Sequence, residues 1–212
     1  MKYSELLAIV ENEPVFETGL LLAGNVSPSY LRRQLSGWVD SGKLWRLRRG
    51  LYAVAPPYQK VKPHPFLVAN RMVAGSYVSL QAALAYYGHI PEYVPVVTSV
   101  TTGRPGEWET PLGHFLYRHI QRDLFHGYER IELGQRQHAF VATPAKALLD
   151  LIYLEPGGDS PAYLESLRLQ NLDRVNLEEL QRMADESGKP KLKRAAVAVA
   201  ELVALRERSD LL

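Results

Sequence analysis

The sequence has no cysteine among its 212 residues, and this absence excludes several kinds of site. Without thiols there is no disulfide framework, no thiolate zinc site and no cysteine nucleophile. No stretch approaches the roughly 18 consecutive apolar residues that a membrane-spanning helix needs, and segment 3–12 lacks the apolar run of a signal peptide. We therefore expect a cytoplasmic protein with no membrane partner.

The motifs of common enzyme classes are also missing. There is no glycine-rich phosphate loop and no Gly-x-Ser-x-Gly motif. A magnesium-dependent nuclease would need Glu-x-Lys or Asp-x-Lys after a strand, and neither occurs. No two of the six histidines are spaced as zinc ligands on a helix. We therefore expect no enzyme activity, no cofactor and no metal, with a DNA-targeted nuclease-like enzyme as an open alternative.

Basic residues are concentrated in one short segment, although the net charge is only +2. Residues 32–52 carry six basic side chains and one acidic side chain. A basic cluster of this kind indicates contact with a polyanion. The alternative to polyanion binding is a small helical domain whose basic residues are only solvated.

Apolar periodicity and capping signals predict three helices near the N-terminus. Residues 3–12 and 16–23 are expected as two short helices, the second ended by Gly24 and Asn25. Ser27 followed by Pro28 predicts the start of a third helix that runs to about residue 41. The apolar residues of this helix share one face; they are Leu31, Leu35, Trp38 and Val39.

After Gly42 the apolar period changes from that of a helix to that of a strand. Strands are predicted at 43–47 and 51–55, with a turn at 48–50 between them. Three helices followed by a small basic hairpin is the order of a winged helix-turn-helix. We therefore predict an α+β protein, with a winged helix-turn-helix DNA-binding domain in residues 1–57.

The remainder of the chain is expected to form a second domain. Residues 58–65 are predicted as a proline-rich linker and 66–212 as a mixed α/β domain with a helical C-terminal tail. In this domain we predict helices at 67–73, 77–87, 144–154, 161–169, 177–186 and 192–206, strands at 94–102, 114–120 and 139–143, and a polar loop at 103–110.

The third helix and the hairpin carry the candidate DNA-binding residues. A helix in the major groove needs an apolar inner face and short polar or basic side chains outside. Arginines around a hairpin turn can lie along the phosphates or enter the minor groove. The predicted contacts are Ser27, Ser29, Tyr30, Arg32, Arg33 and Ser36 on the helix, and Lys43, Arg46, Arg48, Arg49 and Tyr52 in the hairpin.

Three motifs suggest a family when taken together. The first is Gly42-Lys43-Leu44-Trp45-Arg46-Leu47-Arg48-Arg49-Gly50-Leu51-Tyr52, the second is Tyr77-Val78-Ser79-Leu80-Gln81-Ala82-Ala83-Leu84 with Tyr87-Gly88-His89-Ile90, and the third is Thr143-Pro144-Ala145-Lys146-Ala147-Leu148-Leu149-Asp150-Leu151. In order and spacing they resemble the AbiEi-type antitoxins of type IV toxin–antitoxin systems, also called abortive-infection systems. The resemblance covers about residues 1–155.

The resemblance implies a sequence-specific repressor that binds repeats in the promoter of its own operon. It also implies a C-terminal domain that counteracts a nucleotidyltransferase-like toxin as a functional partner, without a stable complex. From the residues alone, Ser79 and Thr143 are explained as helix caps. A stand-alone winged-helix regulator without a toxin partner stays open, as does a protein-interaction module that does not bind DNA.

Overall fold

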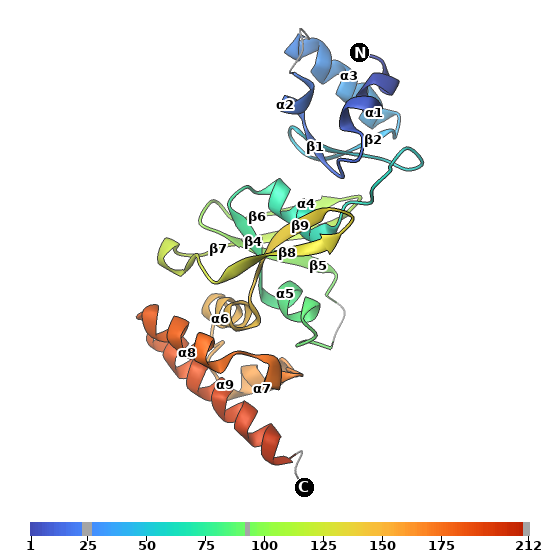
Figure 1. Ribbon diagram of the computed structural model, residues 1–212. Coiled ribbons are helices and arrows are strands. Elements are labelled where there is room, and N and C mark those ends of the chain that lie inside the picture. Colours follow the sequence, from blue (N-terminus) through green and yellow to red (C-terminus); the bar gives the residue numbers. More distant parts are fainter. Residues whose placement is uncertain (23–26, 92–93, 210–212) are drawn as a thin grey trace.

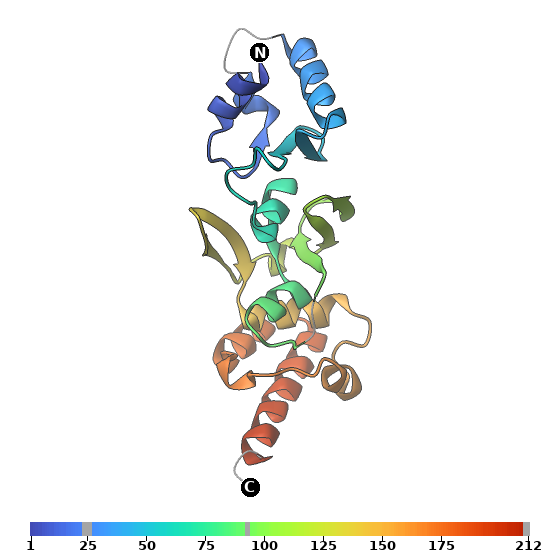
Figure 2. The same ribbon diagram turned by 90° about the vertical axis from the view of Figure 1, so that its right-hand side faces the viewer.

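The computed structural model describes residues 1–22, 27–91 and 94–209 of the chain. In this part of the chain the protein is a mixed α+β structure with two separate β-sheets. Figure 1 shows an elongated molecule with the three-stranded sheet and the first helices at one end, the six-stranded sheet in the middle, and the last helices at the other end. Figure 2 shows the same three levels from the side.

The N-terminal part combines helices with short strands. Its elements are α1 (Tyr3–Val10), β1 (Phe16–Glu17), α2 (Thr18–Leu21), α3 (Pro28–Asp40), β2 (Leu44–Arg48) and β3 (Leu51–Val54). The strands form an antiparallel sheet in the order β1-β3-β2. The third predicted helix is confirmed, and the strands of the predicted hairpin lie within one residue of the expected positions.

The prediction of one helix over 16–23 is wrong at its start. Phe16 pairs with Tyr52 of β3, and the two rings stack with centroids 5.8 Å apart. Pairing satisfies the backbone groups of β1, and the local pattern does not show that a partner strand is near. The helix α2 keeps only four residues, and the predicted cap residues Gly24 and Asn25 lie outside the described residues.

The C-terminal part surrounds a six-stranded mixed sheet with strand order β6-β7-β5-β4-β9-β8. Its elements are α4 (Pro65–Met72), β4 (Ser76–Val78), α5 (Leu80–Tyr86), β5 (Val96–Thr101), β6 (Gly106–Thr110), β7 (Gly113–His119), β8 (Tyr128–Gly134), β9 (Gln137–Ala142), α6 (Pro144–Leu154), α7 (Pro161–Ser166), α8 (Leu177–Glu186) and α9 (Pro190–Ser209), with short 3-10 helices at Arg122–Leu124 and Leu172–Arg174. Within the described ranges, no helix combines the length and apolar composition needed to cross a bilayer.

Three strands of this sheet differ from the sequence prediction. The helix predicted over 77–87 begins only at Leu80, because Ser76–Val78 forms the strand β4 between β5 and β9. The loop predicted over 103–110 contains the edge strand β6, and β8 has no counterpart in the prediction. Each of these segments is a strand because it pairs with a neighbour, which the local residue pattern does not reveal.

The proline-rich segment predicted as a linker is held against the C-terminal part. The buried side chain of Gln137 accepts a hydrogen bond from the His64 amide at 2.8 Å and donates one to the Lys62 carbonyl at 3.0 Å. The amide group of Gln59 donates to the Val54 carbonyl at 2.9 Å. These bonds give residues 58–65 a defined path between the two sheets.

The two parts of the chain also share apolar packing. On β3, Tyr52 and Val54 belong to the core of the N-terminal helices, whereas Leu51 and Ala53 belong to the core of the C-terminal part. All four side chains are buried, so the small sheet is covered on both faces. One face of the sheet therefore docks the N-terminal part onto the rest of the molecule.

Candidate nucleic-acid interface

The helix α3 has one buried face and one exposed face. Leu31 and Leu35 are fully buried against α1 and the small sheet. Arg32, Arg33 and Ser36 are exposed on the other side. The spacing of the two leucines, together with Pro28 at the first helical position, explains why this segment is a helix with this orientation. The polar face of α3 is therefore presented to solvent.

The start of α3 differs from the predicted cap. Ser27 occupies the N-cap position, but its side chain makes no capping hydrogen bond. Its Oγ instead lies 2.9 Å from the Oγ of Ser29, and both residues are exposed, as is Tyr30. The positive end of the helix dipole therefore lies beside two exposed hydroxyl groups, which is a favourable environment for an anion.

Three of the predicted contact arginines have free guanidinium groups. Within the part of the chain that the structure describes, the guanidinium groups of Arg33, Arg46 and Arg49 make no hydrogen bond or ion pair. Arg32 differs, because its Nε donates to the Pro28 carbonyl at 3.1 Å. Unpaired guanidinium groups in solvent are available to bind phosphate or a base edge.

The register of the hairpin places Arg46 on the same side of the sheet as α3. Arg46 is paired with Tyr52, and partners in an antiparallel register point to the same face. Tyr52 packs in the core beneath α3, so Arg46 emerges at the edge of that face. Arg49 is exposed at the turn, where Gly50 has a φ of 83° that favours glycine.

Arg48 points toward the C-terminal part. A register shift between Arg46 and Arg48 interrupts the alternation of β2. The Nη2 of Arg48 lies 3.5 Å from the carbonyl oxygen of Arg71, in the last turn of α4, and its Nη1 donates to the carbonyl of Arg49 at 3.4 Å. A cation is stabilising at a helix C-terminus. Arg48 therefore connects the hairpin to α4 instead of facing the free surface.

Two other predicted contacts lie away from the exposed face of α3. Tyr52 is only 9% exposed and stacks on Phe16, so burial removes it from any DNA-contacting surface. Lys43 is half-buried, with its ammonium group 5.1 Å from the centroid of the Tyr3 ring. Arg48, Tyr52 and Lys43 are thus engaged in contacts inside the protein, whereas the other predicted contacts are exposed.

A second cluster of polar groups is buried in the C-terminal part. The Lys146 ammonium donates to Asp150 Oδ1 and to the Leu124 carbonyl, both at 2.6 Å. Asp150 Oδ2 accepts from the hydroxyls of Ser79 at 2.7 Å and Tyr77 at 3.0 Å. Ser79 therefore bonds to a carboxylate and does not cap α5 as predicted, whereas Thr143 does cap α6. An i, i+4 Lys–Asp pair in an otherwise apolar helix was the available signal for this cluster.

Burial dominates the electrostatics of this cluster. It raises the pKa of the Asp150 carboxyl, while the Lys146 ammonium and the bonds from Ser79 and Tyr77 oppose the rise. Burial, together with the neighbouring Asp150 carboxylate, also raises the pKa of the Tyr77 hydroxyl. Lys146 and Asp150 are only 3% and 1% exposed, so no substrate reaches them. The cluster stabilises the junction of β4, α5 and α6.

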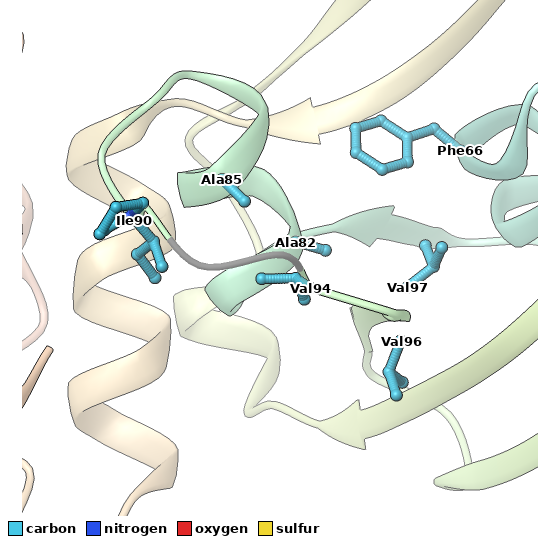
Figure 3. A pocket seen from close by; sticks show the side chains of 8 residues that line it. Phe66, Ala82, Ala85, Ile90, Val94, Val96 and Val97 are labelled. Atoms are coloured by element: carbon cyan, nitrogen blue, oxygen red, sulfur yellow. The ribbon is translucent and has the colours of Figure 1, made fainter.

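The histidines and the apolar cavity beside Phe66 add no second candidate centre of chemistry. Among the described residues, no group of three or more histidine or acidic side chains is arranged to hold a metal ion. A cavity of about 400 Å³ lies between α4, α5 and β5. Figure 3 shows the apolar side chains that line it, including Phe66, Ala82 and Val97. The face of α3 and the hairpin is therefore the best-supported functional surface.

Comparison with known protein families finds no matching family model, and comparison with characterised proteins finds no significant match. The similarity to the AbiEi-type antitoxins therefore rests on the three sequence motifs alone. In the structure, the second and third motifs supply Tyr77, Ser79, Lys146 and Asp150 to the buried polar cluster.

Proposed function

We propose that this protein is a sequence-specific DNA-binding transcriptional repressor in the cytoplasm, and that residues 1–57 form its winged helix-turn-helix. Two observations carry the proposal: the polar face of α3, with Arg33 on it, is exposed, and Arg46 and Arg49 of the hairpin are exposed with free guanidinium groups. The helix would enter the major groove, and the arginines of the hairpin would contact the flanking phosphates.

The proposed contact set is smaller than the one predicted from sequence. It keeps the exposed residues of α3 and its start, together with the exposed arginines of the hairpin. These residues are Ser27, Ser29, Tyr30, Arg32, Arg33, Ser36, Arg46 and Arg49. Lys43, Arg48 and Tyr52 are left out because of their contacts inside the protein.

A gel-shift titration against the DNA upstream of the protein's own gene tests this proposal. We expect tight binding that persists in excess random duplex. Arg33→Ala and Arg49→Ala should each weaken it by roughly 1–3 kcal/mol, or about 5- to 150-fold. Arg130→Ala, which removes an exposed arginine on β8, is the matched control and should bind like the wild type. Unchanged affinity in both test variants would refute the assignment of α3 and the hairpin.

Salt dependence separates phosphate contacts from a merely solvated basic surface. The logarithm of the affinity should fall with the logarithm of the salt concentration by about 0.9 per phosphate neutralised. Each arginine variant that loses a phosphate contact should lower this slope by a similar amount. A slope near zero for the wild type would show that the basic residues do not contact DNA.

We further propose antitoxin activity against a nucleotidyltransferase-like toxin, on the strength of the motif resemblance. Co-expression of the protein with a toxin encoded beside it should restore the growth of cells that the toxin alone arrests. The Arg33→Ala variant should keep this protection while losing promoter binding, because the two activities lie in different parts of the chain. Failure to protect would leave a stand-alone regulator.

A further inference from the structure

A second cavity lies in the C-terminal part, on the side of the sheet that faces α5 and α6. It is open to solvent on one side and has a volume of about 370 Å³, within the range of sites for small molecules. Val96, Thr98 and Leu116 from β5 and β7 line it on the sheet side. The start of α5 contributes Leu80, and the end of α6 contributes Leu154.

The wall formed by Leu80 has an unfavourable backbone conformation. Leu80 has a φ of 54°, which costs a residue with a branched side chain roughly 1–2 kcal/mol. Thr98 holds this turn, because its Oγ1 donates to the Ser79 carbonyl at 2.8 Å and accepts from the Ala82 amide at 3.3 Å. Backbone strain that is held by surrounding bonds is concentrated at functional sites.

The buried polar cluster holds the same turn from behind. The Ser79 hydroxyl donates to Asp150, which is itself paired with Lys146. These bonds fix the residue that precedes Leu80, so the cavity wall keeps its shape without a ligand. A wall that is already ordered lowers the entropic cost of binding.

An arginine and a glutamate line the cavity without forming an ion pair with each other, and the Lys191 ammonium donates to the Glu155 carbonyl at 2.5 Å. Arg118 and Glu155 are both half-buried at its edge. Arg118 Nη2 donates to the Leu154 carbonyl at 3.2 Å, but no ion pair joins Arg118 to Glu155 in the described chain, and the Glu155 carboxylate accepts no hydrogen bond there. The other polar groups at the cavity are Gln81, Thr98 and His114, of which His114 contacts Glu107 at 2.5 Å.

We propose that this cavity binds a small zwitterion with an apolar body, such as an apolar α-amino acid. Arg118 would bind its carboxylate, because the guanidinium fork matches a carboxylate in charge and geometry. Glu155 would bind its ammonium group, and the apolar body would pack on Leu80, Leu116 and Leu151. This proposal is independent of DNA binding.

Isothermal titration of the full chain with L-leucine, L-phenylalanine and L-tryptophan tests the proposal. At least one of them should bind saturably. Arg118→Gln and Glu155→Gln should each weaken its binding about 10- to 100-fold, as expected for the loss of a charged hydrogen bond. The matched controls Arg130→Gln and Glu165→Gln, on exposed residues outside the cavity, should leave affinity unchanged.

Two derivatives of L-phenylalanine show which charge meets which residue. L-phenylalanine amide lacks the carboxylate and should bind the wild type more weakly than L-phenylalanine does. The Arg118→Gln variant should bind this amide as the wild type does, because the carboxylate that Arg118 would contact is absent. N-acetyl-L-phenylalanine lacks the ammonium group. The Glu155→Gln variant should therefore bind it with the same affinity as the wild type does. A merely structural role of either residue would lower the affinity for all three compounds alike.

Filling the cavity gives an independent measurement. Leu116→Trp places a larger side chain on the half-buried wall and should abolish binding, while the melting temperature shows whether the variant is folded. If this variant does not fold, the charge variants and the two derivatives still test whether the cavity binds an amino acid. No saturable binding of any amino acid up to about 10 mM, or equal binding by all variants, would overturn the proposal.

Discussion

Lys146 and Asp150 form an ion pair that is almost completely removed from solvent. Removing two charges from water is costly, and their mutual attraction offsets this cost only when other hydrogen bonds complete the site. Here the Leu124 carbonyl, the Ser79 hydroxyl and the Tyr77 hydroxyl complete it. Removal of one partner leaves the other as an unpaired buried charge. Its free-energy cost is therefore larger than the net stabilisation that the intact pair provides.

The Lys146→Met variant tests this pair, because it leaves Asp150 buried without its cation. We expect the free energy of unfolding to fall by about 3–5 kcal/mol near neutral pH. Burial already raises the pKa of Asp150, and loss of Lys146 raises it further. A carboxyl whose pKa is raised in the folded state loses stability as the pH rises through that pKa.

Urea unfolding of Lys146→Met near neutral pH and at about pH 5 measures this effect. The difference in free energy of unfolding between the variant and the wild type should be smaller at the lower pH. Lys193→Met removes an exposed lysine paired with Asp185 and should be unchanged at both pH values, because exposed ion pairs are worth little. A pH-independent deficit for Lys146→Met would contradict a charged Asp150.

The hairpin formed by β8 and β9 supports the segment between the two sheets. Gln137 begins β9, is 4% exposed, and bonds to the backbone at both Lys62 and His64. A side-chain amide that both donates and accepts can replace the pairing that a neighbouring strand would otherwise provide. The hairpin thereby determines the path of residues 58–65.

Gln137→Ala should release that segment without removing a strand. Loss of two buried hydrogen bonds is expected to cost about 1–3 kcal/mol of stability and to speed limited proteolysis within 58–65. Gln181→Ala, on the exposed face of α8, is the control. The mapped cleavage sites and the urea midpoint measure the two effects, and a protease pattern like that of the control would count against a supporting role for Gln137.

At the scale of the whole molecule, the two sheets are joined by a continuous apolar core. Leu47, Leu51 and Ala53 of the hairpin pack in the same cluster as Leu67 of α4. Arg48 adds a polar link from the hairpin to the last turn of α4. The orientation of α3 relative to the six-stranded sheet is therefore set by packing and not only by a tether.

We expect the full chain to unfold in one cooperative transition, because neither part can open without exposing this shared core. Differential scanning calorimetry of the whole chain should show a single peak. A fragment of residues 1–57 should melt at a lower temperature and bind an apolar dye, since Leu47, Leu51 and Ala53 would face water. Two well-separated peaks for the full chain would contradict a shared core.

The sequence by itself determined most of the helices. Periodicity and capping signals are local, so α3, α6 and α8 were predictable to within about two residues. The exposed polar face of α3 follows from the same periodicity, and with it the positions of Arg33 and Ser36. Local chemistry is sufficient there because a helix satisfies its backbone within one segment.

Only the tertiary structure decided the short strands and the exposure of the hairpin residues. A strand such as β4 or β6 exists because a neighbour pairs with it, and that neighbour is not encoded in the segment itself. The sequence pattern placed Arg48, Arg49 and Tyr52 in one surface group, yet packing on both faces of the small sheet buries Tyr52 and draws Arg48 toward α4. Which side chains of the hairpin remain free depends on what covers each face of the sheet, and this is determined by contacts between residues far apart in the chain.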